Sequence, residues 1–156
     1  MGAVFRWIRD IWLGRRQLGQ TTERATATLT AATVNLFTVS GGRILVTQIL
    51  GQFTIAAAAA ATNIFLQADP TAGTTRGMCA PLNVISYAIG DLLGITGVNT
   101  DAMLPPAMSG VIEGQTFGVI VKEGTIDLVC DLINVGSIRW TLKWVPIDEG
   151  AAVVAA

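Results

Sequence analysis

The spacing of apolar residues changes about 24 residues into the chain. Before that point they recur at the i, i+4, i+7 and i+8 positions of one helix face, at Val4, Ile8, Ile11 and Trp12. From residue 25 onward the pattern changes to short stretches with a period of two, rich in threonine, valine and isoleucine. The pattern predicts a short helical arm in residues 1–24, which ends near Gly14 and leads through a polar linker at 17–22 into an all-β body.

The clearest strand is expected at 138–145, where apolar and polar side chains alternate strictly. One face carries Ile138, Trp140, Leu142 and Trp144, and the other carries Arg139, Thr141 and Lys143. This alternation is typical of an antiparallel strand with one buried face. Further strands are expected at 25–29, 36–39, 43–54, 118–121 and 125–130, with turns at 40–42, 69–73, 122–124 and 134–137.

Three stretches are harder to assign. Six alanines at 56–61 would favour a helix by propensity alone, but strand-like residues flank them on both sides. We therefore interpret them as part of a crowded strand or of a connection between strands. Residues 81–110 are irregular and contain Pro81, Pro105 and Pro106. The small apolar tail at 150–156 is either disordered or packed on a neighbour.

Seven to nine short strands with frequent turns and no alternating helices predict an all-β fold. The expected architecture is an antiparallel, jelly-roll-like β-sandwich with a short N-terminal helical arm. It divides the chain into a basic, Trp-rich arm at 1–24, a β-sandwich domain at 25–147 and an apolar tail at 148–156.

The composition points to burial against other protein or a membrane. Hydrophobic residues make up 51% of the chain and charged residues 13%, about half the share of an ordinary soluble domain. A membrane-spanning helix needs roughly 18 or more consecutive apolar residues. The best candidate, 55–64, is shorter and mostly alanine. The composition therefore favours a multimer or a subunit of a larger assembly.

Charge is distributed unevenly between the two parts. Residues 1–24 carry five arginines, Asp10 and Glu23, for a net +3, and the remainder carries five basic and nine acidic side chains, for a net −4. The arm can therefore attract an acidic partner, or its arginines can simply keep a Trp-rich helix soluble. A sequence pI near 5.2 argues against a nucleic-acid-binding body. Three roles of the arm are considered: nucleic-acid contacts, docking on another protein, and an interfacial membrane helix. Docking on another protein is the favoured one.

The side chains offer little for catalysis, and we expect no enzyme activity, no cofactor, no metal site and no small-molecule substrate. The chain has no histidine, which removes the commonest general base and metal ligand. Asp127 and Asp131 flank Cys130 and are expected to be solvated, as is the pair Asp148-Glu149. The glycines at 110–114 lack the spacing of a phosphate loop. Cys79 and Cys130 are expected to be buried, reduced thiols.

Three segments resemble a known family. They are Leu36–Thr47 (LFTVSGGRILVT), Met78-Cys79-Ala80, and Gly124–Cys130 (GTIDLVC) continuing to Gly136–Pro146 (GSIRWTLKWVP). Together they resemble small structural proteins of tailed bacteriophage heads, across residues 25–147. The resemblance implies a capsid decoration or cement protein that binds the major capsid protein and neighbouring copies as a homotrimer. It also implies a location on the virion capsid surface after assembly in the host cytoplasm.

The arm lies outside the resemblance, so its role is inferred from its residues. We expect its aromatic and aliphatic face to bury against the capsid protein or a neighbouring subunit while two arginines pair with acidic groups there. The expected partner-binding residues are Phe5, Trp7, Ile8, Ile11, Trp12, Arg15 and Arg16. Two alternatives remain open: a tail or fibre component of the same virion, and a membrane-surface protein anchored by the arm.

Overall fold

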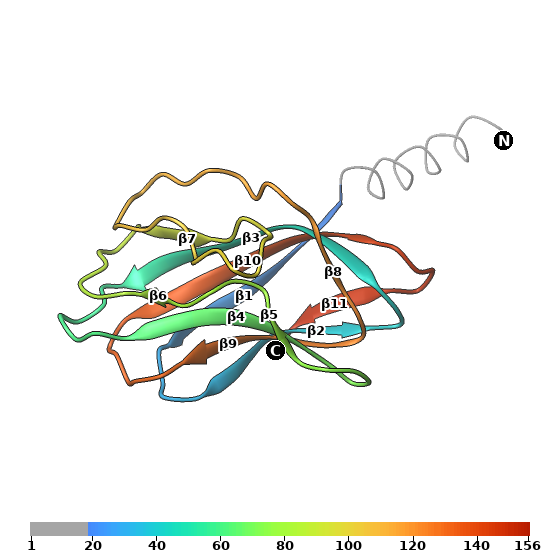
Figure 1. Ribbon diagram of the computed structural model, residues 1–156, viewed down its shortest axis with the longest axis horizontal. Helices are drawn as coiled ribbons and strands as arrows, with labels where there is room; N and C mark the ends of the chain where they lie inside the picture. Colours follow the sequence, from blue (N-terminus) through green and yellow to red (C-terminus); the bar gives the residue numbers. More distant parts are fainter. Residues whose placement is uncertain (1–18) are drawn as a thin grey trace, which may run out of the picture.

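The computed structural model describes residues 19–156 and places them in two antiparallel sheets (Figure 1). An all-β body with antiparallel pairing is therefore confirmed for this part of the chain. Its strands are β1 (Gln20–Thr28), β2 (Thr33–Ser40), β3 (Ile44–Ile55), β4 (Asn63–Pro70), β5 (Arg76–Gly77), β6 (Leu82–Asn83), β7 (Leu92–Gly94), β8 (Val119–Val121), β9 (Gly124–Cys130), β10 (Ser137–Pro146) and β11 (Ala152–Ala155).

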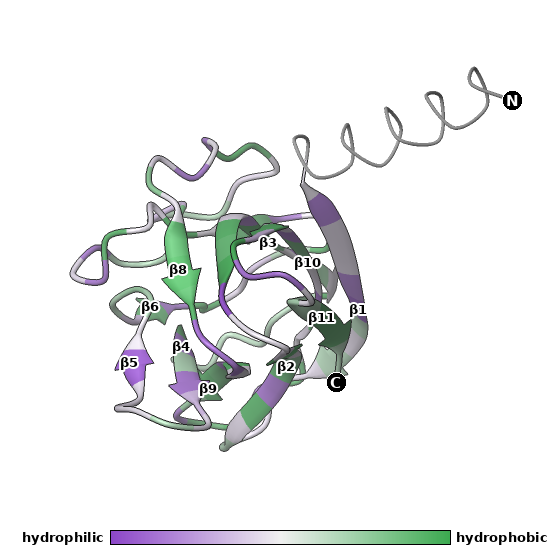
Figure 2. Cartoon of the chain, turned by 90° about the vertical axis from the view of Figure 1, so that its right-hand side faces the viewer, coloured by the Kyte–Doolittle hydropathy of each residue, from purple (hydrophilic) through white to green (hydrophobic). Residues whose placement is uncertain are grey.

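The first sheet has the order β1-β10-β3-β7, and β8 also pairs with β3. The second has the order β11-β2-β9-β4-β5, and β6 also pairs with β4. Figure 2 views the two layers end-on, with β1 and β11 on one side and β8 and β5 on the other. A hydrogen bond from Thr22 Oγ1 of β1 to the Val153 carbonyl of β11 joins the layers on the first side.

Strand β10 confirms the period-two pattern. Ile138, Trp140, Leu142 and Trp144 are each at most 2% exposed, whereas Arg139 and Lys143 are exposed on the opposite face. The buried face packs against the inward residues of β2, β4 and β9, which include Phe37, Ile64, Leu66, Ile126 and Leu128. Burial of these side chains between two sheets supplies the main stabilisation, at about 25 cal/mol for each Å² of apolar surface removed from water.

Strands extend further toward both ends of the chain than the sequence indicated. β1 begins at Gln20, so the expected polar linker at 17–22 contributes its last residues to a strand paired with β10. The tail is neither disordered nor free, because Ala152–Ala155 forms β11 and pairs with β2. Both segments contain residues that favour strands, threonine in β1 and valine in β11, and pairing with β10 and β2 brings them into the sheets.

The alanine run forms a connection between β3 and β4, one of the two interpretations of its sequence. Residues 81–110 contain the short strands β6 and β7 and are otherwise irregular, as expected. The helix predicted in the N-terminal arm falls on residues 1–18, outside the described residues. Within residues 19–156 there is no helix of the length and apolarity that a membrane span requires.

Candidate functional site: an apolar rim and an edge cleft

Exposed aliphatic side chains gather at the end of the body where β3 and β9 finish. They lie at the end of β3 and on the two loops at 84–91 and 131–136, and they are 44–72% exposed. We name this set the apolar rim: Ile55, Ile85, Ile89, Leu132, Ile133 and Val135. The loops concerned lie at the left of Figure 1. An exposed apolar group of this kind on a small body marks a surface for contact with another molecule.

Backbone hydrogen bonds hold the loops of the rim together. The Ala57 N–H donates to the Tyr87 carbonyl at 2.8 Å, and the Ser86 N–H donates to the Ala58 carbonyl at 3.0 Å. Beneath them the rings of Phe53 and Tyr87 pack with their centroids 5.2 Å apart. The loops at 56–62 and 84–91 therefore form one hydrogen-bonded layer, which fixes the positions of Ile85 and Ile89 before any partner binds.

A buried amide fixes the third loop of the rim. Asn134 is 2% exposed, and its Oδ1 accepts hydrogen bonds from the N–H groups of Ala58 and Gly136. Its Nδ2 donates to the Ala60 carbonyl and to Thr62 Oγ1. The Asn134 side chain thus supplies hydrogen-bond partners to several polar groups of the alanine connection. These bonds fix the loop on which the exposed neighbours of Asn134 lie.

The rim is mildly acidic. The end of β3 with the alanine connection (55–62) and the loops at 84–91 and 131–136 contain Asp91 and Asp131 and no lysine or arginine. The Asn63 amide and N–H both donate to the Asp131 carboxylate, at 2.7 and 2.8 Å, and these bonds lower the pKa of Asp131. Both aspartates border the exposed aliphatic side chains, so the rim suits a partner that is apolar and basic.

The opposite end of the body carries charged side chains beside the exposed Ile147. There Arg43 forms an ion pair with Asp148, with Nη2 and Oδ1 2.6 Å apart, and the Arg43 N–H and Nε both donate to Oδ2. The Gly41 N–H donates to the Glu123 carboxylate in the same region. Asp148 remains partly exposed, with 34% of its side chain accessible, and its ion pair was not evident from the sequence, because the return of β10 beside the start of β3 brings it to Arg43.

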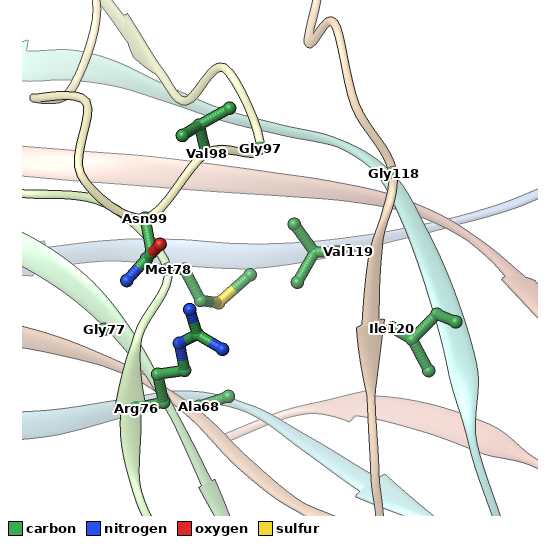
Figure 3. A pocket seen from close by; sticks show the side chains of 10 residues that line it. All are labelled: Ala68, Arg76, Gly77, Met78, Gly97, Val98, Asn99, Gly118, Val119 and Ile120. Atoms are coloured by element: carbon green, nitrogen blue, oxygen red, sulfur yellow. The ribbon is translucent and has the colours of Figure 1, made fainter.

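A second feature is a cleft of about 540 Å³ at the edge where β5 and β8 face each other (Figure 3). Its walls are mostly apolar, and Arg76 is the one ionisable side chain among its lining residues. Figure 3 shows Arg76 and Asn99 on one side of the cleft, with Val119 and Ile120 across from them. The lining residues are Ala68, Arg76, Gly77, Met78, Gly97, Val98, Asn99, Gly118, Val119 and Ile120.

The side chains that line the cleft are suited to binding a ligand. A guanidinium stays protonated at all ordinary pH and donates hydrogen bonds, so Arg76 can hold an anionic or carbonyl oxygen but cannot act as a base. Gly97 has a φ of +93°, and a Cβ there would meet the Phe117 carbonyl oxygen at 2.0 Å. The close contact between these two segments gives the cleft a firm wall.

The expected partner-binding residues, from Phe5 to Arg16, lie outside the described residues. Of the other candidates, Cys79 and Cys130 are confirmed as buried free thiols. Asp131 is exposed as expected, but Asp127 is 5% exposed. The prediction of a solvated Asp127 is wrong because this residue lies within β9 between two neighbouring strands, and Gln67 Nε2 donates to its carboxylate at 3.4 Å.

Sequence reasoning did not identify either the rim or the cleft. The signal available for the rim was the run Leu132-Ile133-Asn134-Val135, an apolar cluster that leads into the turn expected at 134–137. Within residues 19–156 no group of three or more acidic or cysteine side chains is placed to hold a metal ion. Comparison of the chain with protein-family models, curated proteins and solved structures gave no match.

Proposed function

We propose that this protein is a structural component of a tailed-bacteriophage virion. In this role it decorates and stabilises the capsid by binding the major capsid protein and neighbouring copies of itself. The observation that carries the proposal is the apolar rim, a preformed contact surface on a body held by long, continuous strand pairs. A surface that is rigid before binding loses little conformational entropy on association.

The order of strand pairing supports the jelly-roll architecture that the resemblance implies. β1 pairs with β10, β2 with β9, β3 with β8 and β4 with β5. The pairs are nested in sequence: the strands of each pair lie between those of the pair before it. This is the pairing that results when one long hairpin folds over into two sheets. The short N-terminal helical arm remains part of the proposal, with the apolar residues between Phe5 and Trp12 as a contact for the shell or a neighbouring copy.

The role suits the physical properties of the chain. Copies bound side by side on a shell remove apolar surface from water, which accounts for a composition with 13% charged residues. Many contacts of modest strength act together when every copy is held on the same lattice, so the total stabilisation exceeds that of any one contact.

A binding experiment with phage heads tests the proposal. The full chain is mixed with empty heads assembled without it, and bound protein is measured by sedimentation and gel densitometry. We expect saturation at a fixed ratio to the major capsid protein and a higher temperature of head disruption. Ile133→Asp on the rim should reduce binding, whereas Val111→Asp, at a similarly exposed position outside the rim and the cleft, should not.

The same assay separates the alternatives. Binding to isolated tails without binding to heads would replace the proposal with a tail or fibre component. Flotation with anionic liposomes, lost on Trp7→Glu, together with failure to bind heads would replace it with a membrane-surface protein.

A further inference from the structure

The apolar rim lies at the far end of β1 from the N-terminal arm. Thr28, the last residue of β1, is opposite Ser137, which directly follows the loop at 131–136. Gln20, the first residue of β1, is opposite Trp144 near the other end of β10. Residues 1–18 therefore join the body a full strand length away from the rim.

The arm and the rim are complementary in composition. Residues 1–18 carry four arginines and Asp10, for a net +3, together with two tryptophans, Phe5 and several aliphatic residues. The rim presents six exposed aliphatic side chains and two aspartates without a basic residue in its segments. Burial of apolar side chains would hold the arm on the rim, and the opposite charges would attract and orient it there.

Docking of the arm on the rim of its own copy would require residues 12–19 to be fully extended, whereas docking on a second copy does not. From Trp12 to Gly19 a fully extended chain spans at most about 25 Å. The nine residues of β1 span roughly 27 Å, so Trp12 comes near the rim of its own copy only when residues 12–19 are fully extended along β1. The exposed positions of β1 on that path are threonine, glutamine and glutamate apart from Ala25, so they offer little apolar surface for the arm to contact.

We propose that residues 1–18 of one copy dock on the apolar rim of the next copy, in a head-to-tail contact. This inference rests on the proposed function, because a decorating protein must contact its neighbours, and it names the surfaces that do so. A head-to-tail contact uses two different surfaces of each copy, so it closes into a ring or grows into a chain. Closure after three copies would give the expected trimer.

Mixing two defective variants of the full chain tests the contact. The rim variants are Ile133→Asp and, separately, Ile89→Asp, which lie on different loops, so one misfolded protein leaves the other usable. The arm variant is Trp7→Glu combined with Trp12→Glu. The matched control is Val111→Asp, at an exposed apolar position (78%) outside both the rim and the cleft. Masses are measured by light scattering behind gel filtration, with cooperative thermal unfolding as the check on folding.

We expect the wild type and Val111→Asp to be multimers and each rim or arm variant to be a monomer of 16.3 kDa. A one-to-one mixture of a rim variant and the arm variant should form a dimer of twice that mass. In that mixture the intact arm of one protein meets the intact rim of the other, and the defective surfaces prevent further growth. Recovery in the mixture also shows that both variants are folded.

Three results would overturn the inference: a monomeric wild type at 100 µM concentrations, folded rim variants that keep the wild-type mass, or a mixture that remains monomeric. The experiment contains no phage heads, so it fails independently of the proposed function. Complementation without binding to heads would leave the contact standing and remove the capsid role. Binding to heads without complementation would leave the capsid role standing and remove the contact between arm and rim.

Discussion

Asn134 accepts a hydrogen bond of 2.8 Å from the backbone N–H of Ala58, which lies 76 residues earlier in the chain. The same amide bonds to Gly136, Ala60 and Thr62. A single buried side chain therefore ties the alanine connection to the loop that carries half of the apolar rim. The relationship explains how a connection of small residues keeps one conformation without a hydrophobic side chain of its own to anchor it.

Replacement of Asn134 by alanine should lower the free energy of unfolding by about 1–3 kcal/mol, because it leaves buried backbone groups without partners. Urea denaturation followed by tryptophan fluorescence measures the change. Asn99→Ala, at an exposed position in the edge cleft, is the control and should change stability by less than about 0.5 kcal/mol. Equal, small effects for both variants would show that the rim loops are held by other contacts.

Much of the body could be predicted from the sequence where a strand buries one face. In β10 the apolar residues from Ile138 to Trp144 alternate with polar ones, and burial follows the alternation residue by residue. The alanine connection could not be assigned in this way. Its local propensity favours a helix, and its conformation is set by hydrogen bonds to Asn134 and to the Tyr87 carbonyl, both distant in sequence.

Gly51→Ala should destabilise the body by about 1–3 kcal/mol through overpacking. Gly51 lies opposite Trp140 in the pairing of β3 with β10, and a Cβ there would meet indole carbons at 2.9 and 3.0 Å. Trp140 is 1% exposed, so its indole is enclosed by the core and cannot turn out into solvent. The midpoint of thermal or urea unfolding measures the effect.

The matched control is Gly110→Ala, because a Cβ at Gly110 would have no atom within 4 Å. That substitution should leave stability unchanged or raise it by about 0.4–1 kcal/mol, since it restricts the unfolded chain. If Gly51→Ala were as stable as Gly110→Ala, the indole of Trp140 would have to lie elsewhere.

The candidate site was less predictable than the fold because the exposure of side chains in loops does not repeat at a regular spacing, as it does in a strand. Ile89 and Ile133 are apolar residues in irregular segments, and only the course of the connections decides that they face outward. Asp127 shows the opposite case, since a carboxylate next to an expected turn is buried by the strands on either side. Both outcomes depend on tertiary pairing and not on local pattern.

Cys79 and Cys130 should resist alkylation in the native protein. Burial raises the pKa of the Cys79 thiol to about 11, despite an N–H donated by Leu66 at 3.4 Å, and burial also raises the pKa of Cys130. At pH 8 the reactive thiolate is therefore scarce at both positions. Intact-mass measurement after iodoacetamide treatment should show an unmodified native chain and two additions in denaturant. Rapid native labelling at either position would contradict this burial.

Stability should fall in acid through the ion pair between Arg43 and Asp148. The pKa of Asp148 is lowered from 3.8 to about 2, chiefly by the hydrogen bonds that Arg43 donates. A carboxyl whose pKa is lower in the folded state binds its proton more weakly there than in the unfolded chain. The pair therefore contributes its full stabilisation above the unfolded pKa, and that contribution is lost as pH falls from about 4 to about 2.

The difference between the wild type and Asp148→Asn isolates this effect from other carboxylates. We expect the difference in unfolding free energy to stay constant between pH 7 and 5 and to shrink as pH falls from 4 to 2, measured by urea denaturation at each pH. Glu149→Gln removes a neighbouring carboxylate and leaves the pair with Arg43 in place, so it controls for the loss of one charge. Because the guanidinium stays protonated throughout, the change must come from the carboxyl of Asp148. A difference that stays constant down to pH 2 would mean that the ion pair does not form in solution.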